Sequence, residues 1–463
     1  METIEKEISY SINLSQDLLY LILDSYISKK FDFVGKYYDF VDTNNVRTRL
    51  GDNGAVSCQT KNVQNMEKFV FADRNVIIPF VTRISNEIEV NIENIKPELD
   101  KIVECRVYTT KKYPKIEIKF EQIYFNRNLS DRFDSLMASK QIALLNLLQN
   151  RNESIVKQSY LGSDEILANL RIEYEYDDGP NMETINAIAE IVREMDAISH
   201  YQNISPLIPY TTLQNNIIYR KFEGEKLIYN LEDLTNVKKW ALKLDGIRGK
   251  GFFTRNFCII FMDDMQLFAG HFPTLFEINN VVAFQCELID DKLYITDLLH
   301  VFKYTYNNKS QYECSHDGYN IDPITAINTI NFLNGKYSNT SLHIENCHQN
   351  KLEIKFQKFY DPPLPTSLGY TTIATDGFVV LDITLRYVKY KHVKTIELEY
   401  NGKENCFATL EKLLTNYKIN SNIELIHNNI YETVIVDNVI TVIKFRPDRL
   451  VPQMIHDETK MES

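Results

Sequence analysis

Strict alternation between apolar and charged residues is the feature of this chain that most limits its fold. In "IEKEISYSI" (4–12), Glu5 and Glu7 share one face with two serines, and Ile4 and Ile8 share the other. This period of two residues is typical of β-strands. The same pattern recurs in four further segments, "VRTRL" (46–50), "RISNEIEVNIE" (83–93), "KIEIKFE" (115–121) and "RIEYEYDD" (171–178).

A single strand of this kind usually turns its charged face to water. Several such strands, with cations beside carboxylates on the same face, are better explained by a closed barrel with a charged interior and an apolar exterior. Segments 15–28 and 130–150 have helical periodicity and would cover the outside. A last helix is expected at 183–200, before the boundary that we place at "PLIPY" (206–210). The sequence therefore predicts an N-terminal antiparallel β-barrel.

The chain has 463 residues, more than one ordinary domain holds. We predict a multidomain α+β protein with three domains. The predicted domains are an N-terminal barrel at 1–200, a central α+β domain at 201–394 and a small C-terminal β-barrel at 395–463.

Composition restricts the classes of function. Apolar runs such as "QIALLNLL" are far shorter than the roughly 20 residues that span a bilayer, so we expect no membrane span and no signal peptide. The seven cysteines include no C-x-x-C pair, which indicates a reducing, intracellular compartment. The net charge of -12 argues against a general duplex-binding surface. Any nucleic acid must therefore be held by locally concentrated basic residues.

The stretch "KLDGIR" (243–248) suggests a nucleophilic lysine, which can attack phosphorus only when it is neutral. Alone, K-x-D-G is a weak signal, because a surface lysine before a turn-forming Asp-Gly is common. Four later stretches strengthen it: "FQCELIDDKLYITDLL", "TDGFVV", "YVKYKHVKTIEL" and "IKFRPDRLVPQ". Their polar residues are, in order, Glu287, Asp297, Asp376, Lys389, Lys391, Arg446, Asp448 and Arg449.

This ordered set resembles the covalent nucleotidyltransferases, the superfamily of ATP-dependent nucleic-acid ligases and GTP-dependent mRNA capping enzymes. The resemblance implies that Lys243 is the nucleophile and forms a phosphoamide with the α-phosphate of the nucleotide. It also implies that Asp245, Gly246 and Arg248 belong to the same nucleotide-binding motif, and that the central domain is a nucleotidyltransferase domain.

The later motifs carry further implied roles. By resemblance, Glu287 lies at the ribose or a metal, Asp376 helps to hold the catalytic metal, and Lys389 and Lys391 contact the α-phosphate. The last motif would come from an oligonucleotide-binding (OB) type barrel, which closes over the nucleotide and orients the leaving pyrophosphate through Arg446, Asp448 and Arg449.

Two positions depart from the family pattern, and one stretch discriminates between its branches. Cys286 stands where a small glycine usually precedes the third-motif glutamate, and the fourth motif reads Asp-Gly where many ligases have Glu-Gly. The end "FRPDRLVPQ" resembles the capping-enzyme form of the last motif, which favours GTP as the substrate over ATP.

The N-terminal barrel has a resemblance of its own. The distant pairs Glu5/Glu7 and Glu173/Glu175, with basic strands between them, resemble the metal-dependent RNA triphosphatases that are built as a triphosphate tunnel. The resemblance implies that these four glutamates bind a divalent metal, Mg²⁺ or Mn²⁺, because carboxylate oxygens suit a hard cation. It implies that the tunnel contacts to the phosphates include Arg47, Arg171, Lys119 and Glu87.

A triphosphatase followed by a guanylyltransferase over the whole chain resembles the baculovirus late expression factor 4 family. The resemblance implies a bifunctional mRNA capping enzyme that is a subunit of the viral RNA polymerase for late genes. It implies the 5′ end of nascent RNA, GTP and the other polymerase subunits as partners, and the host nucleus as the location.

Other interpretations stay open at this point. The chain could be an ATP-dependent polynucleotide ligase that adenylates Lys243, or mainly a structural polymerase subunit whose motifs are vestigial. A zinc site built from Cys314, His316, His343 and Cys347 is a weaker hypothesis, because no C-x-x-C knuckle accompanies these residues.

Overall fold

The computed structural model describes residues 2–12, 16–91, 99–125, 166–198, 210–227, 236–278, 280–306, 314–345, 351–365, 371–391 and 393–454. These residues are mostly β-structure and form two compact units. Unit 1 comprises Met1–Leu213, Phe276–Val281 and His300–Ile321, and unit 2 comprises Gln214–Leu275, Val282–Leu299 and Asp322–Ser463. None of the helices in the described ranges has the length and apolar character that crossing a membrane requires.

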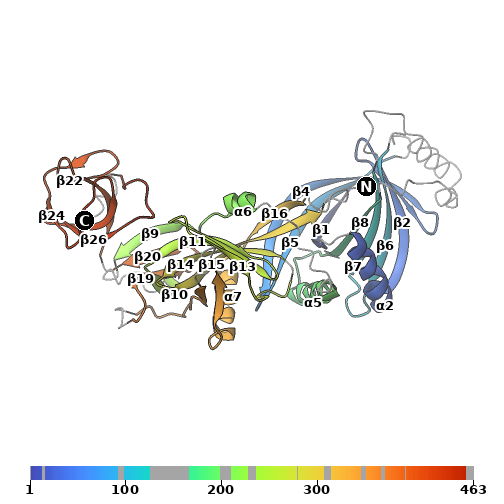
Figure 1. Cartoon of the computed structure of the whole chain (residues 1–463). Helices are drawn as coiled ribbons and strands as arrows, with labels where there is room; N and C mark the ends of the chain where they lie inside the picture. Colours follow the sequence, from blue (N-terminus) through green and yellow to red (C-terminus); the bar gives the residue numbers. More distant parts are fainter. Residues whose placement is uncertain are drawn as a thin grey trace. The chain divides into compact units, whose positions relative to one another are not determined.

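Unit 1 contains a closed β-barrel (Figure 1). Its eight antiparallel strands follow the order β1-β5-β4-β3-β2-β6-β7-β8. The strands are β1 (Glu2–Ser11), β2 (Asp32–Asp42), β3 (Arg47–Gly51), β4 (Val56–Asp73), β5 (Val76–Glu89), β6 (Leu99–Thr109), β7 (Ile116–Phe125) and β8 (Ile166–Glu175). All five alternating segments of the sequence contribute to these strands. The predicted antiparallel barrel is therefore confirmed.

Alternation divides each strand between the interior of the barrel and a core outside it. Ile8, Ile118 and Ile172 are buried together with Ile188 in one apolar cluster, whereas Glu5, Glu7 and Glu173 line an interior cavity. Burying one such side chain contributes about 1.5–3 kcal/mol, so the outer face anchors the helices that cover it.

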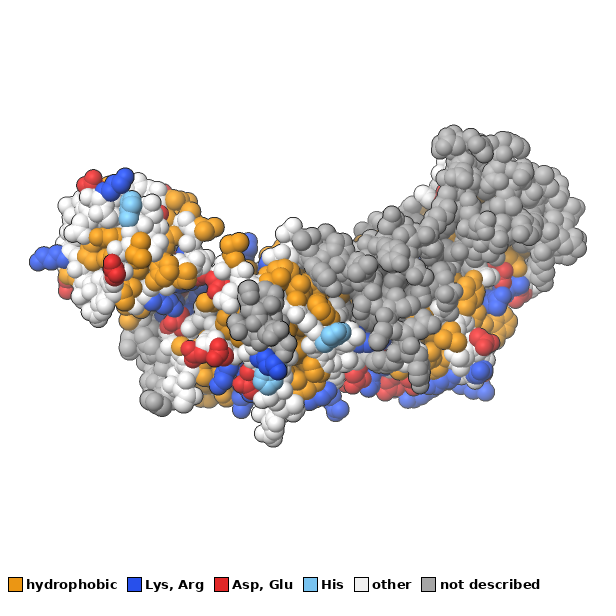
Figure 2. Space-filling view, in the orientation of Figure 1, with side chains coloured by type: hydrophobic (Ala, Val, Ile, Leu, Met, Phe, Trp, Pro, Cys, Tyr) orange, Lys and Arg blue, Asp and Glu red, His pale blue; other side chains and the backbone are white. Residues whose placement is uncertain are grey.

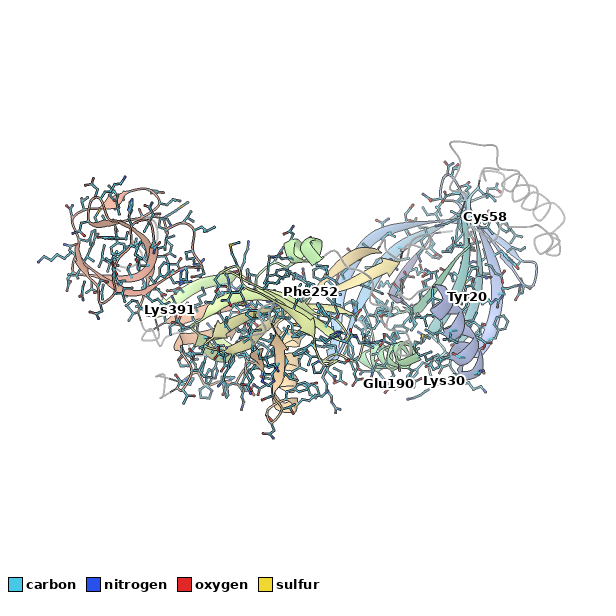
Figure 3. All side chains as sticks on the ribbon, in the orientation of Figure 1. Tyr20, Lys30, Cys58, Glu190, Phe252 and Lys391 are labelled. Atoms are coloured by element: carbon cyan, nitrogen blue, oxygen red, sulfur yellow. The ribbon has the colours of Figure 1, made fainter. Side chains whose placement is uncertain are left out.

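The covering helices are α1 (Gln16–Ile22), the π-helical turn η1 (Leu23–Ile27), α2 (Ser28–Lys30) and α5 (Met182–Ile198). Tyr20 of α1, which is labelled in Figure 3, packs edge-on against Phe120 of β7. The two ring centroids are 5.4 Å apart. The helices predicted at 15–28 and 183–200 are confirmed within the described residues, with a π-helical turn inside the first. The helix predicted at 130–150 lies outside the described residues.

Unit 1 also takes up two segments from the middle of the chain. Asn280 donates a hydrogen bond to the carbonyl of Ile77 at 3.0 Å, and β16 (Cys314–Asn320) pairs with the second half of β15 (Lys292–Tyr306). Nothing in the alternation pattern indicated these additions. The division into three domains at 200 and 394 stays a prediction.

Unit 2 contains two sheets and most of a third. A four-stranded sheet has the order β10-β19-β20-β9, a larger sheet runs β13-β12-β11-β14-β15-β18-β17, and a six-stranded sheet runs β23-β22-β21-β25-β26-β24. The four-stranded sheet consists of β9 (Phe222–Leu227), β10 (Val237–Leu244), β19 (Thr375–Asp382) and β20 (Tyr387–Lys391). The larger sheet adds β11 (Ile247–Phe253), β12 (Phe257–Met262), β13 (Leu267–His271), β14 (Val281–Ile289), β17 (Leu342–Glu345) and β18 (Lys351–Phe356).

Two helices accompany these strands. The helix α7 (Pro323–Lys336) begins after Asp322, whose carboxylate accepts hydrogen bonds from two backbone N–H groups of the first turn. Its Asn334 side chain donates to the carbonyl of Phe356 at 2.6 Å, which fixes the helix beside β18. A shorter helix, α6 (Tyr210–Asn216), precedes the strands of unit 2.

The C-terminal six-stranded sheet encloses a core of its own. Its strands are β21 (Ile396–Asn401), β22 (Cys406–Ala408), β23 (Leu413–Leu414), β24 (Lys418–Asn420), β25 (Ile430–Val436) and β26 (Val439–Phe445). Phe407 and Tyr431 are fully buried in this core with several aliphatic side chains. Its assignment as an OB-type barrel stays a prediction.

Charge on the visible surface is mixed. On the face shown in Figure 2, the Lys and Arg side chains of the described residues are interspersed with Asp and Glu.

Candidate functional site

The stretch "KLDGIR" forms the connection between two sheets of unit 2. Lys243 lies near the end of β10 and Arg248 lies in β11, and the backbone N–H of Asp245 donates to the carbonyl of Ala374 at 3.0 Å. A Cβ atom on Gly246 would lie 2.3 Å from the carbonyl oxygen of Leu288, far inside the contact distance. Only glycine fits at this crossing, which explains the residue type.

Lys243 is held by a carboxylate from the neighbouring strand. Its Nζ atom lies 2.7 Å from both carboxylate oxygens of Asp376, and its side chain is only 17% exposed. Lys243 and Gly377 are directly opposite each other in the β10–β19 register. The residues predicted from "KLDGIR" and "TDGFVV" therefore meet.

Two further lysines approach the same place from β20 (Lys391 is labelled in Figure 3). The Nζ atom of Lys391 lies 3.0 Å from the hydroxyl of Thr395 and 3.9 Å from Asp376. Burial, together with the positive charges of Lys243 and Lys391, lowers the pKa of Lys389 to about 8. The three lysines thus form a desolvated cationic cluster that suits a polyphosphate.

Glu287 and Arg248 face each other across the β11–β14 pair. Burial raises the pKa of Glu287 to about 8, although Lys243 and Arg248 act to lower it. Cys286, which departs from the family pattern, is fully buried opposite Gly249 in the regular strand β14. The departure therefore leaves the strand and the carboxylate in place.

The last motif lies in the loop that follows β26. Arg446 makes two parallel contacts with Asp448 at 2.8 and 2.9 Å, and its Nη1 atom lies 2.8 Å from Glu397, which Arg449 also contacts at 3.1 Å. Lys444 forms an ion pair with Asp245 of the "KLDGIR" turn. These contacts join the last motif to the first within unit 2.

One cavity of about 220 Å³ brings these groups together. Every residue that the sequence assigned to nucleotide chemistry lines it, namely Lys243, Asp245, Gly246, Arg248, Glu287, Asp376, Lys389, Lys391, Arg446, Asp448 and Arg449. The sequence assigned no role to Tyr219, Arg220 or Glu225, which also line the cavity. Arg220 forms a two-point ion pair with the buried Asp297, at 2.8 and 3.2 Å.

A glycine next to Asp376 provides a test of this packing. A Cβ atom on Gly377 would lie 1.9 Å from the carbonyl oxygen of Tyr390 on β20. We expect Gly377→Ala to lower the free energy of unfolding by about 3 kcal/mol, at the upper end of overpacking costs, because backbone atoms cannot move aside. Denaturant unfolding measures this value.

The matched control is Gly224→Ala in β9 of the same sheet. No atom lies within 4 Å of the Cβ position of Gly224, so the expected change is below about 1 kcal/mol. Equal stability changes for the two variants would contradict the close packing of β19 on β20.

A second cavity, of about 710 Å³, lies within the barrel of unit 1. All residues predicted for the triphosphate tunnel line it, namely Glu5, Glu7, Glu173, Glu175, Arg47, Arg171, Lys119 and Glu87. The pairs Glu5/Glu7 and Glu173/Glu175 come together because β1 and β8 are antiparallel neighbours, with Glu7 directly opposite Glu175.

Charge within the barrel is closely balanced. Burial would raise the pKa of Glu173, but Arg171 and Lys119, at 2.7 and 2.6 Å, lower it to about 2. Burial also raises the pKa of Glu175, and the adjacent negative charge of Glu5 adds to this effect. One carboxylate is therefore neutralised by fixed cations, and the other faces a like charge.

The sequence missed two cations next to the glutamates. Lys61 contacts both Glu5 and Glu7, and Arg83 lies 3.0 Å from the other oxygen of Glu7. Arg83 could have been found, because it shares a strand face with Glu87 in "RISNEIE". Lys61 had no such signal, since its strand lacks alternation and is interrupted between Val63 and Asn65.

The donor set suits a hard divalent cation, although the side chains are not arranged around one. Among the described residues, no group of three or more His, Cys, Asp or Glu side chains has the geometry of a metal site. The observation that fits a cation is the like-charge contact of Glu5 with Glu175, because a divalent ion between carboxylates would remove this repulsion. In the zinc hypothesis, Cys347 and the side chains of Cys314 and His316 lie outside the described residues.

Comparisons with known proteins identify relatives over nearly the whole chain. The model of the family described as Late expression factor 4 (LEF-4) matches residues 5–453. The mRNA capping enzyme LEF-4 of Autographa californica nuclear polyhedrosis virus is 48% identical over 463 residues, covering 97% of this chain and 98% of that protein. The enzyme of the same name from Orgyia pseudotsugata multicapsid polyhedrosis virus is 41% identical, with 98% of both chains covered.

Solved structures give a weaker likeness. The S. pombe Pct1 RNA triphosphatase is 11% identical with a TM-score of 0.23, covering 41% of this chain and 76% of that chain. The Mimivirus capping enzyme triphosphatase has the same identity and TM-score, and covers 42% of this chain and 88% of that one. At this TM-score the likeness carries no argument.

Proposed function

This chain belongs to the late expression factor 4 family, and from that membership we propose that it is a bifunctional mRNA capping enzyme. It removes the γ-phosphate from the 5′ end of RNA and then transfers GMP from GTP to the diphosphate end. The observation that carries the proposal is the convergence of all the predicted nucleotide-chemistry residues on one cavity around Lys243.

The transfer proceeds in two displacements at the same phosphorus atom. The neutral Nζ atom of Lys243 attacks the α-phosphorus of GTP, the bond to the bridging oxygen of the β-phosphate breaks, and pyrophosphate leaves. Nζ gives up a proton, for which the carboxylate of Asp376 at 2.7 Å is the nearest acceptor. A terminal phosphate oxygen of the RNA then attacks, the P–N bond breaks, and Lys243 regains a proton as GpppRNA forms.

The surrounding side chains supply charge and orientation. Lys389 and Lys391 contact the α-phosphate, where they stabilise the negative charge of the transition state. Arg446 and Arg449, positioned by Asp448 and Glu397, orient the leaving pyrophosphate. Glu287, which faces Arg248 across the β11–β14 pair, would contact the ribose or a metal. A divalent metal near Asp376 would add neutralisation of phosphate charge.

The barrel cavity performs the first reaction, the removal of the γ-phosphate. Glu5, Glu7, Glu173 and Glu175 would hold Mg²⁺ or Mn²⁺, which supplies Lewis-acid polarisation of the phosphate. Arg47, Lys119 and Arg171 hold the phosphates, and Glu87 positions Arg47 through a contact at 3.2 Å. Because these cations line the interior of the barrel, the 5′ triphosphate of the RNA would have to enter the cavity to react.

The family resemblance also suggests a larger assembly, a viral RNA polymerase, in which the chain works. We propose that the chain works as a subunit of a viral RNA polymerase in the host nucleus and receives the nascent 5′ end from its partners. The acidic net charge supports this role, since a chain with charge -12 attracts free RNA poorly and gains from direct delivery.

The test is incubation of the purified chain with α-labelled GTP or, separately, α-labelled ATP and Mg²⁺ or Mn²⁺, followed by denaturing electrophoresis. We expect a labelled protein band from GTP and none from ATP. Label from ATP would identify a ligase, and absence of label from either nucleotide would favour a structural subunit and contradict the proposal.

A further inference from the structure

Tyr219 and Asp263, which lie outside all the predicted motifs, both contact the side chain of Arg248. The Nε atom of Arg248 lies 2.8 Å from one carboxylate oxygen of Asp263, and the guanidinium group lies 4.0 Å from the centre of the Tyr219 ring. The hydroxyl of Tyr219 donates to the other oxygen of Asp263 at 2.7 Å. The three side chains form a closed triangle, which we call the Arg248 clamp.

The clamp draws its members from separate parts of unit 2. Tyr219 follows α6, Arg248 belongs to β11, and Asp263 begins the turn after β12. The backbone reinforces the contact, since the N–H of Asp263 donates to the carbonyl of Arg248 at 2.8 Å. The Nζ atom of Lys250 donates to the carbonyl of Ile217 at 2.9 Å, which ties the segment before Tyr219 to β11.

The clamp orients a side chain that would otherwise move. The Arg248 side chain is 42% exposed, and a free arginine side chain has about 2 kcal/mol of rotamer entropy to lose on binding. The ring of Tyr219 fixes the plane of the guanidinium group and Asp263 fixes its rotation. Among the described residues, the two terminal amino groups of Arg248 have no hydrogen-bond partner, so both can donate to oxygens of a ligand.

We infer that Tyr219 and Asp263 are positioning residues that hold Arg248 ready for the oxygens of the bound nucleotide. The inference rests on the proposed function of the cavity. Neither residue has to touch the nucleotide. Their contribution is to orient Arg248 before binding, which lowers the entropy cost of forming its hydrogen bonds.

The environment of the clamp keeps Tyr219 protonated and Arg248 charged. Burial raises the pKa of the Tyr219 hydroxyl, and the hydrogen bond to Asp263 raises it further, so Tyr219 remains a donor at neutral pH. Burial would lower the pKa of Arg248, but the charge of Asp263 and the hydrogen bond to it raise the pKa, so the cation persists.

The test uses variants that remove single interactions. Tyr219→Phe keeps the ring and removes the hydroxyl, and Asp263→Asn keeps the shape and removes the charge. We expect the KM for GTP in enzyme–GMP formation to rise about 3-fold for Tyr219→Phe, because the ring still stacks on Arg248 and only the hydrogen bond from the hydroxyl to Asp263 is lost. For Asp263→Asn we expect a rise of about 10-fold or more, as a charged contact is lost. The kcat should change less than KM in both.

A double-mutant cycle separates positioning from general stability. In an Arg248→Lys background, which lacks the planar guanidinium group, Tyr219→Phe should leave KM unchanged. The control is Tyr26→Phe, which removes another tyrosine–carboxylate hydrogen bond, to Glu194 in unit 1, and should not affect KM. The thermal midpoint of each variant is measured in parallel.

The outcomes are distinct. A 3-fold effect of Tyr219→Phe that persists in the Arg248→Lys background would overturn the clamp, and so would unchanged KM values for Tyr219→Phe and Asp263→Asn. Failure of the wild-type chain to accept label from GTP would instead overturn the proposed function.

Discussion

Replacing Lys243 by alanine is expected to abolish the covalent guanylate on the protein while leaving RNA triphosphatase activity intact. Loss of the nucleophile removes the atom that bonds to phosphorus, so GMP transfer should fall by about 10⁴-fold or more, the scale seen when other enzymes lose their nucleophile. Triphosphatase activity persists because it depends on glutamates and cations inside the barrel of unit 1. Both activities are measured on the same preparation, with labelled GTP and γ-labelled pppRNA.

The Lys243→Arg variant distinguishes the nucleophilic role of Lys243 from its positive charge. Lys243→Arg keeps a cation opposite Asp376, but a guanidinium group cannot lose its proton in a protein and cannot attack phosphorus. We expect Lys243→Arg to be as inactive as Lys243→Ala. Lys238→Ala is the matched control, because Lys238 is exposed on the same strand and does not line the cavity.

The chemistry of the label provides a second check. A P–N bond breaks in acid and survives in base, so the guanylate on the wild-type chain should be lost in acid and retained in alkali. Label that survives acid, or that remains on Lys243→Ala, would show that another residue is guanylylated.

The sequence predicts two sets of residues, those that alternate along the barrel strands and those that belong to the ordered motifs. Period-two alternation located the barrel, because a barrel interior and its outer core need opposite kinds of side chain at each step. The ordered motifs predicted the residues that line the nucleotide cavity. These residues lie close together because β10, β11, β14, β19 and β20 bring their ends together there.

The remaining residues follow from packing that a linear pattern does not encode. Lys61 lies on β4, where the irregular pairing at Val63 and Asn65 interrupts the alternation, so nothing marked it as an interior cation. Tyr219 and Asp263 lie on either side of "KLDGIR" at no fixed spacing, and their relation to Arg248 exists only in three dimensions. Individual positions that support a motif residue are therefore visible only in the fold.

Replacing Glu175 by glutamine is expected to reduce RNA triphosphatase activity strongly without destabilising the metal-free protein. Glutamine preserves the size of the side chain and removes one of the proposed metal ligands. Lewis-acid stabilisation is worth several kcal/mol, and each ~1.4 kcal/mol is a factor of ten, so we expect a loss of about 100-fold or more. Enzyme–GMP formation should be unchanged.

The stability of this variant distinguishes a ligand from a structural carboxylate. Burial and the charge of Glu5 raise the pKa of Glu175 in the folded chain. Between the ordinary pKa of a glutamate and the raised pKa of Glu175, the group is ionised in the unfolded chain and still largely protonated in the folded chain. The free energy of unfolding therefore falls as the pH rises through this range. Glu175→Gln removes this loss, and its thermal midpoint without metal should equal or exceed that of the wild type at neutral pH.

Glu173 provides the matched comparison for Glu175. Glu173 has the opposite environment, since Arg171 and Lys119 hold its pKa near 2 and its charge is part of the folded network. Glu173→Gln leaves both cations without this partner and should therefore lower the thermal midpoint as well as the activity. If Glu175→Gln destabilised the metal-free chain as much as Glu173→Gln, Glu175 would be a structural carboxylate and the proposed ligand set would have to exclude it.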